Sequence, residues 1–394
     1  MRRVFLLGAI MLLAFTSAAS SEEAVHACGD FLYEMLEDGT VGIVGYNGND
    51  AHLVIPAELD GKKVSVIGAT NLTNRWKYNI DCDDVVSIEI EEGIEDLMPS
   101  TLYCRNLETI YLPASLNCEM RGWSRMNPFI NCDDLKEIKV AKNHPVLEIR
   151  NGALIDKSRN ELIAYPKQSK EKKIIPDGVR RIGAFAYEFI EGMDGISIPD
   201  GVEEVARYAF AFTDVKRIYL PETLKKLEGG AFKGCRELTY VYIPKNVNLE
   251  IQSPFTTCVS LTEIDVAEDH PELFKINGMV ISKESQQLIC VEAGHKDYVI
   301  PDEVKSIADE VFEGMTVRTI KVSKGVETIG RAAFEGAYGL KSITLPVSVK
   351  QIGENAFTYW SPEAAKELDL ICYVSNEYAA QYCEAAGIKY EWAE

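Results

Sequence analysis

Cysteine and histidine are the side chains of this sequence that could bind a metal or act as nucleophiles. The chain of 394 residues contains ten cysteines and five histidines. A structural zinc site needs close pairs of such residues, typically C-x-x-C, and the sequence contains no pair of that spacing. We therefore expect no structural metal and no cofactor.

Five of the cysteines occupy one position of a recurring pattern, where a small buried side chain suits a packed turn. Each precedes an apolar strand residue by three positions; they are Cys82, Cys104, Cys132, Cys235 and Cys258. One interpretation is a column of buried thiols. The other is disulfides, because adjacent repeats would bring Cys82 close to Cys104 and Cys235 close to Cys258.

The remaining polar motifs do not indicate catalysis. His144 and His270 each precede a proline at equivalent positions, which favours a role in a turn. The paired acids Asp83-Asp84 and Asp133-Asp134 are interpreted as solvated turn residues, with weak calcium binding as the alternative. The sequence has no G-x-S-x-G, phosphate-binding loop or H-E-x-x-H motif. We expect a protein that is not an enzyme.

The elements that position these residues recur with a short period. Similar apolar segments end at Pro176, Pro199, Pro221 and Pro244, which lie at nearly equal intervals. The interval of about 23 residues falls in the range of roughly 20 to 29 residues that is typical of solenoids. We expect about a dozen such coils over residues 51–360.

Each coil is expected to contribute a strand with one buried face, ended by proline where its missing N–H is harmless. Parallel stacking at about 4.8 Å would produce a rod about 60 Å long. One aromatic residue from each coil would form a column inside it: Tyr187, Phe210, Phe232 and Phe255.

A block of several coils is duplicated at a constant shift along the chain. Residues 128–155 align with residues 254–281. In both copies an Asn-Gly pair precedes a short apolar strand, a polar turn and another apolar stretch. This pattern predicts β-hairpin insertions near residues 151–172 and 277–297.

Both ends of the chain depart from the repeat. Residues 1–20 have the pattern of a signal peptide, with cleavage near Ala19, and residues 21–50 predict a hairpin cap. Residues 361–394 predict a small α/β cap with a strand, a helix and a strand. Cys372 and Cys383 could form a disulfide between that strand and that helix.

Composition and charge describe a folded, acidic chain. Hydrophobic residues make up 46% and charged residues 26%, and the formal net charge is -20. Nucleic acids and anionic membrane surfaces would be repelled on average, so neither is an expected partner. No later stretch approaches the roughly 20 apolar residues of a membrane span.

Several segments resemble the sequences of the BspA-like leucine-rich repeat proteins of bacterial cell surfaces. They are IPDGVRRIGAFAY, LPETLKKLEGGAF and LPVSVKQIGENAF, with the opening GDFLYEMLEDG and the ending YAAQYCEAAGIKY. The resemblance implies an α/β-type, mostly β, right-handed leucine-rich-repeat solenoid with coils of about 22–23 residues. It also implies export and binding or adhesion to host matrix proteins or other cells, and no catalytic residues.

One surface patch is a candidate binding site. Strand alternation turns four residues outward on adjacent coils: Arg217, Tyr219, Tyr240 and Tyr242. Tyrosine and arginine are favoured as interface anchors. The alternative is that these tyrosines only cover the face of a sheet.

We therefore predict a secreted or cell-surface binding and adhesion module for a protein or glycan partner. The alternatives are a structural or assembly component of the cell envelope and an enzyme such as a glycan hydrolase, which would need two carboxylates converging in a cleft.

Overall fold

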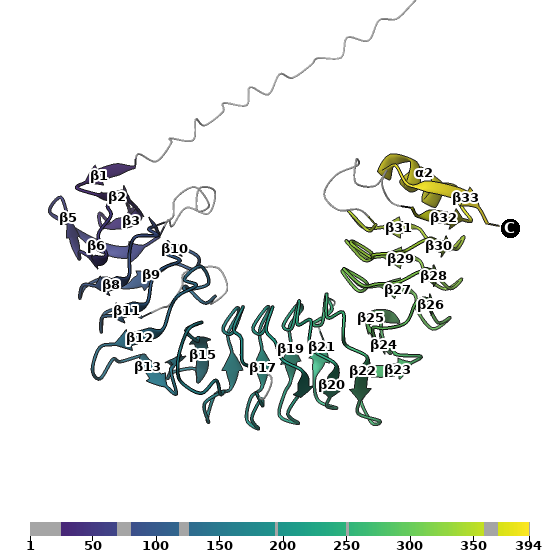
Figure 1. The fold of residues 1–394 in the computed structure, drawn as a ribbon, viewed down its shortest axis with the longest axis horizontal. Helices are drawn as coiled ribbons and strands as arrows, with labels where there is room; N and C mark the ends of the chain where they lie inside the picture. Colours follow the sequence, from purple (N-terminus) through teal and green to yellow (C-terminus); the bar gives the residue numbers. More distant parts are fainter. Residues whose placement is uncertain are drawn as a thin grey trace, which may run out of the picture.

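The computed structural model describes residues 25–68, 80–117, 126–193, 196–249, 252–357 and 369–393. The predicted signal peptide and its cleavage near Ala19 lie outside these residues. Figure 1 shows an arc in which the N-terminal strands and the C-terminal helix end two arms that rise on the same side. The chain is a mostly β repeat fold, and α2 (Glu377–Ala386) is the α-helix of the described part.

The strands of the described residues form seven sheets. The N-terminal sheet contains β1 (His26–Cys28), β2 (Phe31–Met35), β3 (Val41–Tyr46), β5 (Glu58–Leu59), β6 (Lys62–Ile67) and β9 (Asp96–Leu97). The next two contain β4 (His52–Ile55), β8 (Ser87–Ile90), β11 (Thr109–Leu112) and β12 (Glu137–Val140), and β7 (Ile80–Asp81) with β10 (Leu102–Tyr103).

Two sheets form the central part. One contains β13 (Leu147–Arg150), β14 (Ala153–Asp156), β15 (Glu161–Ala164), β16 (Arg181–Ile182), β17 (Glu204–Val205), β19 (Lys226–Leu227) and β21 (Asn248–Leu249). The other contains β18 (Arg217–Tyr219), β20 (Tyr240–Ile243) and β22 (Glu263–Val266).

Two further sheets form the C-terminal arm. The first contains β23 (Leu273–Ile276), β24 (Met279–Ser282), β25 (Gln287–Val291), β27 (Ser306–Ile307), β29 (Thr328–Ile329) and β31 (Gln351–Ile352). The second contains β26 (Asp297–Val299), β28 (Thr319–Lys321), β30 (Ser342–Leu345), β32 (Ile371–Val374) and β33 (Lys389–Trp392). In Figure 1, β27, β29 and β31 face the space enclosed by the arc, and β26, β28 and β30 lie on its outer side.

The strands of successive coils pair in parallel. Arg181 in β16 is opposite Glu204 in β17, which is opposite Lys226 in β19, so paired residues lie one repeat period apart in the sequence. In β18 the buried Ile218 stands between two exposed residues, as expected for a strand with one face in the core. Each coil therefore presents its apolar side to the interior and its polar side to water.

The aromatic column predicted from the sequence is confirmed. The ring centroids are 5.3 Å apart from Tyr187 to Phe210, 5.1 Å from Phe210 to Phe232 and 5.8 Å from Phe232 to Phe255. The side chains of Tyr187, Phe210 and Phe232 are fully buried. Each ring covers the ring of its neighbour, so no coil completes its core alone.

The stack is an arc and not the rod expected from uniform stacking, because it bends at the duplicated segments (Figure 1). In each copy three antiparallel strands follow one another, β13–β14–β15 and β23–β24–β25, and the last of them pairs in parallel with the next coil. Asn151 and Gly152 make the first turn with φ angles of 50° and 78°. Figure 1 places both groups of strands at the two corners of the arc, where the antiparallel strands interrupt the regular stacking.

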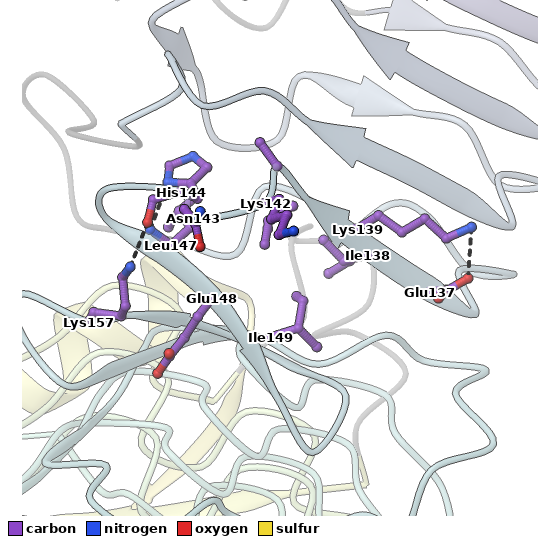
Figure 2. Close-up of a pocket in the computed structure, with 12 residues that line it drawn as sticks. Glu137, Ile138, Lys139, Lys142, Asn143, His144, Leu147, Glu148, Ile149 and Lys157 are labelled. Atoms are coloured by element: carbon purple, nitrogen blue, oxygen red, sulfur yellow. Dashed lines mark hydrogen bonds and ion pairs between the residues drawn. The ribbon is translucent and has the colours of Figure 1, made fainter.

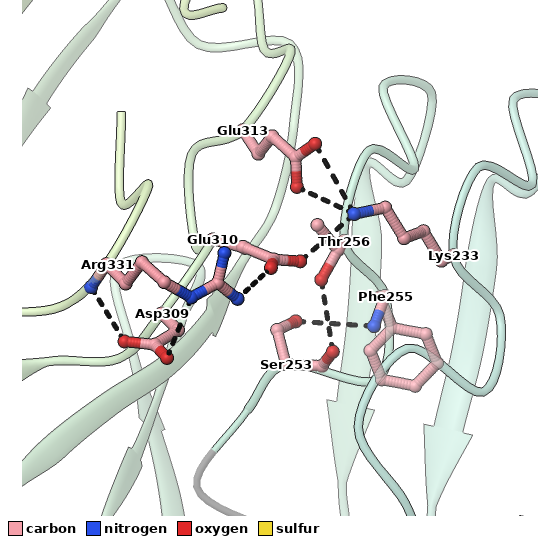
Figure 3. Close-up of polar contacts among 8 residues, drawn as sticks. All are labelled: Lys233, Ser253, Phe255, Thr256, Asp309, Glu310, Glu313 and Arg331. Atoms are coloured by element: carbon pink, nitrogen blue, oxygen red, sulfur yellow. Dashed lines mark hydrogen bonds and ion pairs between the residues drawn. The ribbon is translucent and has the colours of Figure 1, made fainter. Parts of the chain in front are cut away.

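Polar contacts across the second corner join turns that are far apart in sequence. The ammonium of Lys233 lies 3.0 Å from a carboxylate oxygen of Glu310 and 3.0 Å from one of Glu313 (Figure 3). Arg331 forms a second ion pair with Glu310. Burial by itself would raise the pKa of Glu310, but the charges of Lys233 and Arg331 hold that pKa below its usual value. This cluster connects a central coil to the C-terminal arm.

The first corner is crossed by hydrogen bonds to backbone carbonyls and by the ion pair of Lys167 with Asp133 at 2.7 Å. The backbone N–H of Asn127 donates to the carbonyl of Ala184 at 3.0 Å, and its side-chain amide donates to the carbonyl of Phe185 at 3.0 Å. Residues 128–155 and 254–281 are related by a constant shift along the chain, and the same shift relates Ala184 to Glu310. Equivalent positions of the two copies therefore stabilise the two corners by different interactions.

Both interpretations of the cysteines apply, each to different residues. Cys82 and Cys104 form a disulfide between adjacent coils, with their Cα atoms 4.8 Å apart. Cys235 and Cys258 are buried free thiols that donate to backbone carbonyls at 3.1 and 3.0 Å. The disulfide suggested for the C-terminal cap is not formed. The other free thiols of the described part are Cys28, Cys132, Cys290, Cys372 and Cys383.

The aromatic column predicts a large loss of stability for Phe232→Ala. Removing a fully buried ring leaves a cavity between two stacked neighbours, so we expect a loss of about 3 to 5 kcal/mol in urea unfolding. Val299→Ala is the control, because Val299 is 61% exposed. A loss below about 1 kcal/mol for Phe232→Ala would contradict the column.

The disulfide predicts that Cys104→Ser lowers stability by about 3 kcal/mol, because the bond closes a loop of 22 residues in the unfolded chain. Cys258→Ser is the matched control in an equivalent turn. Alkylation of the denatured, unreduced wild type followed by peptide mass mapping should leave Cys82 and Cys104 unmodified. Complete alkylation would show that no disulfide is present.

Candidate binding surface

The candidate patch is built by three neighbouring parallel strands. Arg217 in β18 is opposite Tyr240 in β20, and Tyr219 is opposite Tyr242. β22 continues the ladder, with Asp265 opposite Tyr242. Because side chains alternate along a strand, these residues lie on the same outer face while Ile218, between Arg217 and Tyr219, enters the core.

Arg217 holds two of the tyrosines together. Its guanidinium lies 4.2 Å from the ring centroid of Tyr240 and 5.9 Å from that of Tyr219, and it donates to the Tyr219 hydroxyl at 3.3 Å. The two rings are 5.2 Å apart and tilted by 46°. Tyr219 is thus oriented by its neighbours while 57% of it stays exposed.

The structure differs from the sequence prediction on Tyr240. Tyr240 is on the outer face but only 8% exposed, because Arg217 and Tyr219 cover its ring. Burial raises the pKa of Tyr240, and its hydroxyl is 3.2 Å from a carboxylate oxygen of Asp265. Tyr240 therefore supports the patch from beneath, and Tyr219 and Arg217 supply its exposed surface.

Charged residues border the patch, and the sequence analysis did not identify them as part of it. Tyr242 is half-buried and its hydroxyl donates to Glu222 at 3.2 Å, while Lys275 pairs with Asp265 at 3.7 Å. The repeat period already places Asp265 beside Tyr242, because the two positions are one period apart. Glu222 and Lys275 come from a turn and a hairpin strand, and the period does not indicate their contacts. The patch combines an aromatic centre with a charged rim.

Apart from the patch, a hollow lies between β12 and β13, at the turn that connects them. It has a volume of about 560 Å³ and is lined by charged side chains that include Lys139, Lys142 and Glu148 (Figure 2). Lys139 pairs with Glu137 at 3.2 Å, which neutralises part of the wall. The lining offers several charges but no aromatic anchor.

His144 lies at the edge of this hollow and orders the turn, as the sequence predicted. Its Nδ1 accepts backbone N–H groups of Val146 and Leu147 at 3.2 and 2.9 Å. His270 does the same in the second copy, where its Nδ1 accepts from Glu272 and Leu273. An acceptor Nδ1 is unprotonated, so both imidazoles are in the neutral form. Burial lowers the pKa of each.

The other candidates for chemistry have structural partners. Asp83 accepts the backbone N–H of Arg105 in the next coil, and Asp133 pairs with Lys167 at 2.7 Å. Within the described ranges, no three His, Cys, Asp or Glu side chains gather as metal ligands. Helices in the same ranges are too short or too polar to cross a membrane.

The stacked parallel strands define a mostly β repeat protein. The model of the BspA type leucine rich repeat region matches six copies, over residues 69–158, 161–278 and 292–383. These ranges cover most of the chain, which therefore belongs to this family. The resemblance found in the sequence is confirmed.

Solved structures similar to this chain are bacterial leucine-rich repeat proteins. A leucine rich cell surface protein from Faecalibacterium prausnitzii is 20% identical, with 95% of this chain and 96% of that chain covered and a TM-score of 0.45. A leucine-rich repeat protein from Eubacterium ventriosum is 14% identical, with 88% and 77% covered and a TM-score of 0.39. One from Bacteroides ovatus is 18% identical, with 94% and 100% covered and a TM-score of 0.35. No curated protein matches the chain.

The buried histidines predict a loss of stability in mild acid. Their pKa is lowered in the folded state, so below the ordinary histidine pKa of about 6.5 the unfolded chain binds protons that the folded chain does not. Stability should therefore fall as the pH decreases from about 7.5 to about 5.

The double variant His144→Asn, His270→Asn tests this assignment. An asparagine oxygen can accept the same N–H groups, as Asn127 does for Phe129 at 2.9 Å, but it does not titrate. Urea unfolding midpoints should vary less with pH in the variant than in the wild type. Equal pH dependence would exclude the two histidines as its source.

Proposed function

We propose that this protein is a secreted or cell-surface module that binds a protein or glycan partner, without catalysis. The observation that carries the proposal is the patch of Arg217, Tyr219, Tyr240 and Tyr242, in which an exposed tyrosine is held by an arginine. Membership of the BspA type leucine-rich repeat family supports a role in recognition at the cell surface.

The contacts within the patch favour binding. Tyrosine and arginine contribute most strongly to interfaces when they are already ordered, because little conformational freedom is then lost. Tyr219 is oriented by Arg217 before any partner arrives, and Tyr242 is restrained by Glu222. The tyrosine hydroxyls can donate or accept hydrogen bonds with a peptide or a sugar, and the carboxylates of the rim can accept them.

The same proposal includes the handedness of the fold, the length of its coils and the location of the mature chain outside the cell. A right-handed solenoid with coils of about 22–23 residues agrees with the regular offset between paired strands. Arg2 and Arg3 before an apolar run support a signal peptide over residues 1–20, which would send the mature chain outside the cell.

The test is a binding screen followed by substitution. Wild-type protein is screened by biolayer interferometry against immobilised collagen, fibronectin and laminin, and on a glycan array. For a hit, Tyr219→Ala with Tyr242→Ala should weaken binding at least about tenfold, the effect of losing roughly 1.4 kcal/mol.

Tyr338→Ala is the matched control, because Tyr338 is 64% exposed and lies outside the patch. Binding that is unchanged in the double variant would exclude the patch. Self-association of the wild type in sedimentation, with no hit in the screen, would favour a structural role in the envelope.

A further inference from the structure

Two phenylalanines form an exposed stacked pair on turns of adjacent coils. Phe189 follows β16 and Phe212 follows β17, and the two are 52% and 41% exposed. Their ring centroids are 4.7 Å apart and their planes differ by 6°. This pair is separate from the tyrosine patch, which lies on β18 and β20.

Both phenylalanines have a backbone conformation that their side chains disfavour. Each has a φ of 58°, in the left-handed region where the Cβ of an L-residue is crowded. The backbone N–H at this position donates to the next coil: Phe189 to Ala211, Phe212 to Lys233 and Gly234 to Thr256. The stacking of coils therefore requires the conformation, and Gly234 adopts it at a φ of 71° without that crowding.

The fold itself does not require aromatic rings at this position. Later coils have smaller residues there, with positive φ: Thr257, Gly314 and Gly336. The core is already filled by the column of Tyr187, Phe210 and Phe232. Phe189 and Phe212 thus carry a conformational cost and leave much of their apolar surface in water.

The neighbouring residues keep the rings flat against the turns. A Cβ added to Gly234 would be 2.4 Å from Cδ1 of Phe212, so that ring lies directly over the glycine. At the other end, the ammonium of Lys167 lies 5.4 Å from the ring centroid of Phe189. The pair is therefore held in place by a cation on one side and by bare backbone on the other.

The chemistry of the pair indicates an apolar ligand group. Phenyl rings have no hydrogen-bonding groups of their own, so they select the apolar part of a ligand, and the acidic net charge of the chain repels nucleic acids. The cation that borders the pair is already neutralised, because Lys167 pairs with Asp133. The chain carries a formal charge of -20, so a basic partner is attracted and an acidic one is repelled.

We propose that the Phe189–Phe212 pair is a second docking site, which binds an apolar side chain in a basic segment of another protein. The contact is hydrophobic, and the net charge of the chain favours basic residues beside it. The site goes beyond the proposed function, because it does not use the tyrosine patch and would let one chain contact partners at two places.

The test uses labelled synthetic peptides and a double glycine variant. In the first peptide Leu-Phe-Leu stands between lysine pairs; in the second serines replace the apolar residues; in the third glutamates replace the lysines. Fluorescence anisotropy should show that the wild type binds the first peptide at least tenfold more tightly than the other two. Phe189→Gly with Phe212→Gly should remove this preference.

The glycine variant separates binding from folding. Glycine accepts the φ of 58°, so the midpoint of thermal unfolding should be no lower than in the wild type. Tyr219→Ala should keep the peptide preference, which distinguishes this site from the tyrosine patch. The proposal is overturned by equal binding of the three peptides, by unchanged binding in the glycine variant, or by a large fall of its unfolding midpoint. It is also overturned if the variant instead loses glycan binding or self-association.

Discussion

The structure depends on the stacking of each coil against the next. A single coil is too small to bury its apolar residues, and the rings of Tyr187, Phe210 and Phe232 are covered only by one another. Parallel pairing fixes the register of this column, because a slip of one residue would turn Ile218 outward and Arg217 inward. Core packing and surface pattern therefore come from the same backbone ladder.

The two corners of the arc are local departures from that ladder. Antiparallel strands at β13–β15 and β23–β25 interrupt the stack, and contacts across each corner connect its two sides. One corner is crossed by the hydrogen bond of Asn127 to Ala184 and by the ion pair of Lys167 with Asp133. The other is crossed by the ion pairs of Lys233 with Glu310 and Glu313. A buried cluster of charges stabilises less than its short distances suggest, because desolvation opposes the attraction. Its geometry still restricts how the C-terminal arm can be oriented.

The cysteine and histidine side chains, which could act as nucleophiles or metal ligands, mostly stabilise the repeat structure instead. Cys82 and Cys104 link two coils, while Cys235 and Cys258 donate to carbonyls inside the stack. His144 accepts backbone N–H groups in a turn. By contrast, Tyr219 and Phe212 are exposed aromatic residues that the core does not need. Their exposure is the reason that we propose these two surfaces as binding sites.

The sequence by itself determined the repeat, the aromatic column, the turn role of His144 and the strand alternation that turns Tyr219 outward. These features are local or periodic, so spacing along the chain is enough to find them. Only the tertiary structure decided that Cys82 bonds to Cys104 while Cys235 stays a thiol, and that Tyr240 is covered by Arg217. It also decided the arc, the contact of Lys233 with Glu310 and the stacking of Phe189 on Phe212. The physical reason is that a period specifies which residues are neighbours, whereas distances, covering side chains and contacts across a corner depend on how the whole stack bends.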